Sequence, residues 1–184
     1  MPEEQVILVD KKDKQIGLME KMVAHKGKGH LHRAISVLLY RTRNGKTEVL
    51  LQQRSKSKPL WPFFWSNTVC GNVLKGETYR DTASRRLKDE LGIEAKNGMI
   101  KPLYKFQYQA KYDEQFGENE LDQVFVGELG QKFQPNPDEV SEIKWLEWKE
   151  LKKNINRARK YTPWLKKMTQ SRKLQDYFNE REVK

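Results

Sequence analysis

Short runs of apolar residues, separated by polar and glycine-containing segments, predict a succession of β-strands. Asn44-Gly45 separates two of these runs, and this dipeptide strongly favours a two-residue hairpin turn. Strands are predicted over residues 6–9, 15–22, 33–41, 47–53, 66–70, 104–112, 121–128 and 143–148.

Helical periodicity is clearest over residues 77–91, where Ala83, Leu87 and Leu91 can share one inner face. Gly92 follows, as expected just beyond a helix C-terminus. Further helices are predicted over residues 149–154 and 164–182, and loops over residues 24–32 and 56–64. Because strands and helices are interleaved, we expect an α/β (α+β) fold in which a mixed β-sheet lies between helices.

The length and composition predict a single domain over residues 1–184. Charged residues make up 33% of the chain, but the apolar residues are periodic, which favours a folded protein. No apolar stretch approaches the roughly 20 residues that span a bilayer, so no membrane association is expected. The N-terminus lacks the pattern of a secretory signal, and a lone cysteine, Cys70, suits the reducing cytoplasm. The sequence allows either a monomer or a homodimer.

Basic residues are concentrated in the C-terminal segment. The whole chain carries a net charge of +11, and residues 151–184, with eleven basic and three acidic side chains, carry +8 of it. We expect this segment to be helical and to pack on the domain. Its charge could form a solvated helical face, attract an anionic substrate or bind nucleic acid. Nucleic-acid binding is not expected, since no recognisable signature of it accompanies the charge.

The segment from residue 71 to residue 93 combines a glycine with a helix that carries several charged side chains. A glycine-containing turn allows the backbone to approach a phosphate, and a following helix can direct carboxylates at metal ions. The segment therefore predicts a site for divalent metal and diphosphate. Its spaced residues are Gly71, Glu77, Arg85, Leu87, Glu90, Gly92 and Ile93.

These seven positions match the pattern of the Nudix box, so the segment resembles that of the Nudix superfamily. Arg86 and Asp89 depart from the pattern, and Arg86 stands where a metal-binding glutamate is usual. This reversal of charge argues against ordinary Nudix hydrolysis.

Motifs along nearly the whole chain resemble the type 1 isopentenyl-diphosphate isomerases, a branch of the same superfamily. The resemblance implies a Nudix fold and the interconversion of isopentenyl and dimethylallyl diphosphate, two prenyl diphosphates. The motifs are Ala24-His25, Leu31-His32, residues 54–58 before Trp61-Pro62, residues 67–71, Tyr108, residues 118–120 and Pro163-Trp164.

The resemblance also implies roles for individual residues. Cys70 and Glu120 would be the acid–base pair, Tyr108 would hydrogen-bond Glu120, and Trp164 would stabilise a carbocation. The substrate-binding residues are Lys21, Arg54, Lys58 and Arg86, which would bind the diphosphate, and Trp61, which would close the substrate pocket.

Two metal sites are implied as well. Mg²⁺ on the diphosphate would bind Glu90, and a second ion (Mg²⁺, Mn²⁺ or Zn²⁺) would bind a cluster of imidazoles and carboxylates. Asn72 stands where the family usually has a third histidine, which shifts the preference towards a hard ion such as Mg²⁺. The residues of this second site are His25, His32, Asn72, Glu118 and Glu120.

Other interpretations stay open for the same residues. Cys70 could be a buried apolar residue, and the two histidines could be ordinary loop residues. The chain could instead hydrolyse a nucleoside or prenyl diphosphate. It could also be a catalytically impaired Nudix-like module that binds RNA through its basic tail.

Overall fold

The computed structural model describes residues 4–96, 98–157 and 160–181, and its centre is strand β3 (His32–Arg43). This strand pairs with β1 (Gln5–Val9), β4 (Lys46–Arg54), β6 (Val69–Asn72) and β8 (Gly117–Glu128). The β3–β8 pair is parallel and the other three are antiparallel, so the predicted mixed sheet is confirmed. Within the described residues the sheet has nine strands, and the others are β2 (Gln15–Glu20), β5 (Trp65–Ser66), β7 (Ile100–Lys111) and β9 (Val140–Glu147).

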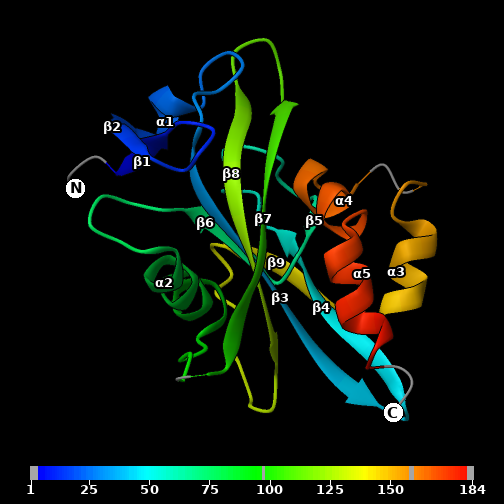
Figure 1. Ribbon diagram of the computed structural model, residues 1–184. Helices are drawn as coiled ribbons and strands as arrows, with labels where there is room; N and C mark the ends of the chain where they lie inside the picture. Colours follow the sequence, from blue (N-terminus) through cyan, green and yellow to red (C-terminus); the bar gives the residue numbers. More distant parts are fainter. Residues whose placement is uncertain (1–3, 97, 158–159, 182–184) are drawn as a thin grey trace.

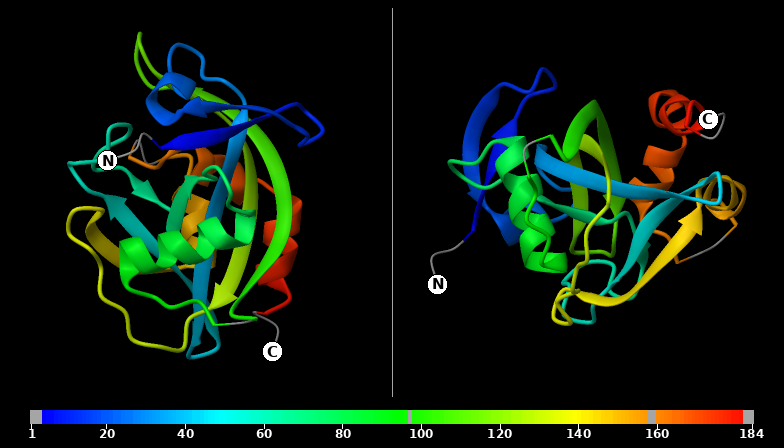
Figure 2. Two further views of the ribbon diagram at one scale, coloured as in Figure 1. Left: turned by 90° about the vertical axis from the view of Figure 1, so that its left-hand side faces the viewer. Right: turned by 90° about the horizontal axis from the view of Figure 1, so that it is seen from below.

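Helices cover both faces of the central sheet (Figure 1, Figure 2). Helix α2 (Tyr79–Leu91) lies on one face, and three C-terminal helices lie on the other. Each layer has its own core, because neighbouring residues of β3 point to opposite faces. The remaining helices are α1 (Lys21–Ala24), α3 (Trp148–Asn154), α4 (Pro163–Thr169) and α5 (Arg172–Asn179).

The predicted hairpin joins β3 to β4. Asn44 has φ 51° and Gly45 has φ 72°. A type I′ turn needs positive φ at both central residues, and these two residue types adopt it most readily. The hairpin prediction is therefore confirmed.

The strand predicted over residues 66–70 is wrong in one respect, since it is two short strands, β5 and β6. Between them, the Thr68 hydroxyl accepts from the Leu39 amide (2.8 Å) and donates to the Leu50 carbonyl (2.7 Å). The side-chain amide of Asn67 donates to the backbone carbonyls of Val37 and Val69. These polar side chains take hydrogen bonds that a continuous ladder would make, so the strand is interrupted.

The helix predicted over residues 164–182 is also wrong, because the chain forms α4 and α5 with Gln170 and Ser171 between them. Ser171 has extended backbone angles and precedes α5, a position that serine favours over a helix interior. Residues 158–159 and 182–184 of the predicted C-terminal segment lie outside the described residues.

Helix α2 confirms the helix predicted over residues 77–91, and its ends and its buried face explain why the sequence pattern was clear. Thr78 and Asp81 form a capping box at its start, and Gly92 ends it in the left-handed conformation. Ala83, Leu87 and Leu91 are buried on its inner face, as predicted. Across the described ranges, no helix is long and apolar enough to cross a membrane.

Candidate active site

The sheet register brings four distant parts of the sequence to one face. Cys70 on β6 pairs with Ser36 on β3, while His32 on β3 pairs with Glu120 on β8. Glu120 in turn pairs with Tyr108 on β7. Since paired residues point to the same face, these side chains share the side of the sheet that faces α4.

A pocket of about 410 Å³ opens on this face. The pocket is lined by the reactive and aromatic residues predicted from the sequence and by four of the five predicted substrate-binding residues. The predicted residues that line it are Lys21, His25, Arg54, Lys58, Cys70, Asn72, Arg86, Tyr108, Glu118, Glu120 and Trp164.

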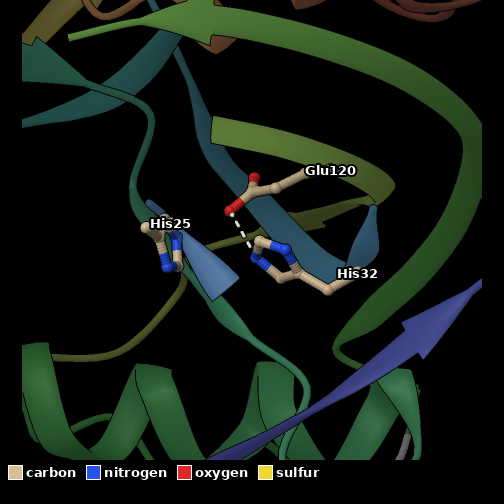
Figure 3. A group of neighbouring side chains, drawn as sticks. All are labelled: His25, His32 and Glu120. Atoms are coloured by element: carbon tan, nitrogen blue, oxygen red, sulfur yellow. Dashed lines mark ion pairs between the residues drawn. The ribbon is translucent and has the colours of Figure 1, made fainter. Parts of the chain in front are cut away.

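His25, His32 and Glu120 form a buried group whose ligand atoms lie within 4.8 Å of one another (Figure 3). Nδ1 of His25 lies 2.6 Å from the Lys21 carbonyl, and Nδ1 of His32 lies 2.7 Å from the His30 carbonyl. Each Nδ1 therefore donates, which leaves each Nε2 on the side of the ring that faces the group. Burial, with the neighbouring His32, lowers the pKa of His25, so it is held neutral. Two imidazoles beside a carboxylate are a donor set that fits a divalent ion.

The Asn72 side chain reaches the same group. Its Nδ2 lies 3.0 Å from Nε2 of His32 and 2.9 Å from Oε1 of Glu120. Both neighbours are acceptors, so the amide places its nitrogen towards them. A cation at this point would require the opposite orientation, with the amide oxygen inward.

Glu118 and Glu120 share the hydroxyl of Tyr108. This hydroxyl lies 2.5 Å from Oε2 of Glu120 and also contacts Oε2 of Glu118. Burial and the charge of Glu120 raise the pKa of Glu118. At Glu120 burial is outweighed by polar contacts, among them the hydrogen bond from the Tyr108 hydroxyl, so its pKa lies below its ordinary value. The two carboxyls therefore ionise as a pair, in which Glu118 keeps a proton to higher pH than Glu120.

Cys70 is half-buried in the pocket, with Sγ 3.5 Å from Nη1 of Arg54. Burial raises the pKa of its thiol to about 12, although the charge of Arg54 opposes the rise. The thiol therefore carries its proton at neutral pH. The other Arg54 nitrogens donate to the carbonyls of Leu60 and Trp61, so Arg54 also holds the loop over the pocket.

Two tryptophans form the aromatic side of the site. Trp164 donates from Nε1 to Ser66 and Asn67, at 2.9 Å each, which fixes its ring. Trp61 packs edge-on against Trp164, with ring centroids 5.5 Å apart, and is buried. Trp61 thus supports the pocket wall from behind and does not line the pocket itself.

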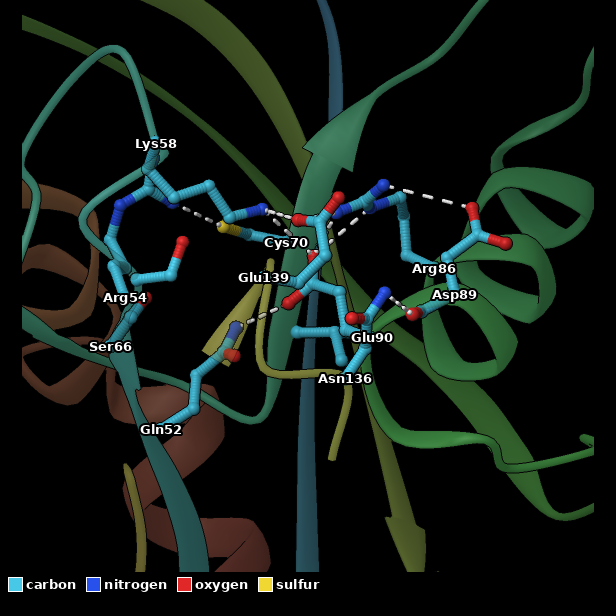
Figure 4. A network of polar contacts seen from close by, with 12 residues as sticks. Gln52, Arg54, Lys58, Ser66, Cys70, Arg86, Asp89, Glu90, Asn136 and Glu139 are labelled. Atoms are coloured by element: carbon cyan, nitrogen blue, oxygen red, sulfur yellow. Dashed lines mark hydrogen bonds and ion pairs between the residues drawn. The ribbon is translucent and has the colours of Figure 1, made fainter. Parts of the chain in front are cut away.

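Arg86, Lys58 and Glu90 form an ion-pair network at the base of α2 (Figure 4). Glu90 is completely buried, and its Oε1 accepts from Arg86 at 2.5 Å while its Oε2 accepts from Gln52 at 2.5 Å. Gly71 lies in β6 and not in a turn, which corrects the expectation of a glycine turn there. A Cβ at Gly71 would lie 2.9 Å from the Arg86 side chain, so glycine makes room for this arginine.

The remaining predicted substrate-binding residue of the lining, Lys21, forms an ion pair with Glu4, with Nζ 2.7 Å from Oε2.

Four acidic residues of the pocket were missed by the sequence analysis, and they are Glu4, Asp122, Asp138 and Glu139. Asp122 is buried and accepts from the Ser36 hydroxyl at 2.7 Å. Its position two residues after Glu120 in a strand was a usable signal, because alternate residues share a face. Glu139 contacts both Lys58 and Arg86 from the loop before β9, and nothing local in the sequence indicated this.

Comparisons with known proteins identify the family of the chain. A NUDIX domain model matches residues 30–165. The chain is 41% identical to isopentenyl-diphosphate Delta-isomerase 1 of Photorhabdus laumondii, over 89% of this chain and 92% of that protein. It is 39% identical to the chloroplastic isopentenyl-diphosphate Delta-isomerase I of Arabidopsis thaliana, over 90% of this chain and 64% of that protein.

The fold is also similar to a solved structure from Deinococcus radiodurans, with a TM-score of 0.72 at 22% identity, covering 90% of this chain and 97% of that one. The central motif, the sheet and these relatives agree. The chain belongs to the NUDIX-domain family, in the branch of the isopentenyl-diphosphate Delta-isomerases.

Proposed function

We propose that this protein interconverts isopentenyl diphosphate and dimethylallyl diphosphate by moving a proton on and off the carbon skeleton. The relatives that carry this activity in their names support the proposal, at 36–41% identity over 89–90% of this chain. The structural observation that carries it is that Cys70 and Glu120 line one pocket together with Trp164.

The reaction requires a proton donor and a proton acceptor on either side of the substrate. Protonation of the terminal alkene carbon forms a tertiary cation, and loss of a proton from C2 forms the new double bond. In the site described above, Cys70 carries a proton and the pKa of Glu120 lies below its ordinary value. One of the two residues would donate a proton and the other would accept one, and the roles exchange in the reverse direction.

The cationic intermediate needs protection from water and a face of negative potential. The Trp164 ring is held by two hydrogen bonds and is 2% exposed, so it offers such a face at a fixed position. Tyr108 hydrogen-bonds the carboxylate of Glu120 and keeps it oriented.

Divalent metal use follows from the family, and the donor set of this chain fits an ion. His25, His32 and Glu120 would hold it, with Asn72 and Glu118 beside them. When bound, the ion supplies positive charge that favours the ionised form of Glu120. Mg²⁺, Mn²⁺ and Zn²⁺ all suit mixed imidazole and carboxylate ligands to different degrees.

The diphosphate would be held by the basic residues of the pocket. Arg86 and Lys58 lie beside Glu90, the residue proposed to bind Mg²⁺ on the diphosphate. Lys21 and Arg54 contribute further positive charge to the lining. Arg86 thus has a use in gripping the substrate, while it removes a carboxylate that hydrolysis would need. We place the activity in the cytoplasm, since the one cysteine is a free thiol.

Incubation with isopentenyl diphosphate and Mg²⁺ tests the proposal. Dimethylallyl diphosphate is the expected product, and Cys70→Ala and Glu120→Gln should each abolish its formation. Release of phosphate in place of this product would indicate a hydrolase. No turnover together with salt-dependent RNA binding would indicate a binding module.

A further inference from the structure

One oxygen of Glu139 bridges two cationic side chains in the pocket. Its Oε2 accepts from Nη2 of Arg86 at 2.9 Å and also contacts Nζ of Lys58 (Figure 4). These are two of the residues proposed to bind the diphosphate. An oxygen shared between two cations is also how a phosphate oxygen is held in basic sites.

The fold holds Glu139 at this position through its backbone. The Glu139 carbonyl accepts from the Ser55 amide at 3.1 Å, and its own amide donates to the Asn136 carbonyl at 3.0 Å. Asn136 is in turn tied to α2, because its amide donates to the Glu90 carbonyl at 2.8 Å. The loop therefore delivers the carboxylate to the cations, and the contact does not depend on attraction between side chains alone.

The two acidic partners of the cations differ in how readily they can leave. The Glu90 side chain is fully buried and also accepts from Gln52, so it is part of the interior. The Glu139 side chain is 27% exposed and lines the pocket. A ligand entering the pocket can therefore replace Glu139 while Glu90 stays in place.

The Glu139 carboxylate is strongly stabilised in its charged form. Although burial opposes the shift, the charges of Arg86 and Lys58 lower its pKa to about 2. The carboxylate is thus an anion at neutral pH, where a diphosphate is also charged, and it competes for the same two cations.

We propose that Glu139 is an internal competitor that occupies the place of a substrate phosphate oxygen between Lys58 and Arg86. The inference rests on the proposed function, because it takes a diphosphate as the ligand of these cations. In the empty pocket Glu139 neutralises and orders both side chains. Only an anion with enough charge to replace it on both cations displaces it, so the pocket selects diphosphate over singly phosphorylated or monovalent anions.

The test measures binding of inorganic pyrophosphate and inorganic phosphate by calorimetry, in EDTA so that no divalent ion contributes. Glu139→Gln should bind pyrophosphate roughly tenfold more tightly than the wild type, equivalent to about 1.4 kcal/mol. Its preference for pyrophosphate over phosphate should fall by a similar factor. Glu142→Gln is the matched control, since Glu142 is exposed on β9 outside the pocket lining and its loss changes the net charge equally. It should bind within about twofold of the wild type.

Equal or weaker binding of pyrophosphate by Glu139→Gln, or no detectable binding by either protein, overturns the proposal. Glu139→Asp keeps the charge but shortens the side chain so that it cannot reach both cations. It should bind with intermediate affinity, and wild-type affinity for this variant also overturns the proposal. Circular dichroism verifies that each variant is folded.

Isomerisation by the wild type is assayed separately with isopentenyl diphosphate. If the wild type isomerises the substrate but Glu139→Gln binds pyrophosphate no more tightly, the role of Glu139 as a competitor is refuted and the proposed function stands. If Glu139→Gln binds pyrophosphate more tightly but the wild type shows no turnover, the proposed isomerase function is refuted and the role of Glu139 as a competitor stands.

Discussion

Nδ2 of Asn72 lies 2.9 Å from Oε1 of Glu120, so an amide N–H group points to where the proposed metal ligands converge. The same nitrogen lies 3.0 Å from Nε2 of His32. Without an ion this orientation satisfies two acceptors. With an ion the amide must turn its oxygen inward and release both hydrogen bonds, which weakens binding by the cost of that rearrangement.

Asn72→His should strengthen Zn²⁺ binding roughly tenfold or more and change Mg²⁺ binding less, because imidazole is a better donor to transition ions than an amide oxygen. Competition with a chromophoric chelator measures both affinities. Asn179→His makes the same chemical change at an exposed residue at the end of α5 and serves as the control. Unchanged Zn²⁺ affinity in Asn72→His would show that Asn72 already serves as well as histidine.

Asp122→Asn should stabilise the metal-free protein at pH 8. Burial, followed by the charge of Glu120, raises the pKa of Asp122 above its ordinary value of 3.8. Among the described atoms, its Oδ1 is buried with no hydrogen-bond partner. The pKa of Asp122 is higher in the folded protein than in the unfolded chain. Its contribution to the free energy of unfolding is therefore fully present below the unfolded pKa and is lost as pH rises through the folded pKa.

Urea unfolding at pH 4 and pH 8 checks this expectation. At pH 4 both proteins should have similar free energies of unfolding. At pH 8 the variant should be more stable by roughly 1 kcal/mol or more. The expectation is contradicted if the difference in free energy of unfolding between the variant and the wild type does not increase in favour of the variant from pH 4 to pH 8.

Trp164→Leu should lower kcat by roughly tenfold or more with a smaller change in KM, because the ring stabilises a cation that exists only during the reaction. Trp164→Phe should retain an intermediate rate, since phenylalanine keeps a π face but loses the hydrogen bonds to Ser66 and Asn67. Trp145→Leu is the control, because Trp145 packs on the core of the other face. Equal loss in kcat and in thermal stability for all three variants would indicate a packing role only.

The Glu139 carboxylate should make stability depend on pH in the acid range. Its pKa falls from 4.5 to about 2 in the folded protein, so its stabilisation is present above the unfolded value and is lost as pH falls towards 2. Its partial exposure reduces the effect to roughly 1–2 kcal/mol. Glu139→Gln should lack this part of the acid dependence in urea unfolding between pH 5 and pH 2. The Glu142→Gln control should keep it.

Local sequence determined the parts of this protein whose hydrogen bonds close within a few residues. The Asn44-Gly45 turn adopts the angles that its residue types favour, and Gly92 ends α2 for the same reason. The family resemblance identified the reactive side chains, and all but three of those predicted to form the site line one pocket. Trp61 lies behind it, and His32 and Glu90 are fully buried beside it.

Only the tertiary structure decided how these groups are paired. Strand register placed Asp122 in the lining of the pocket, and a loop distant in sequence brought Glu139 to Lys58 and Arg86. Polar side chains at Asn67 and Thr68 took over ladder hydrogen bonds and divided a strand that the apolar pattern made continuous. Such contacts join residues tens of positions apart, and their free energy depends on burial and charge that exist only once the sheet has formed.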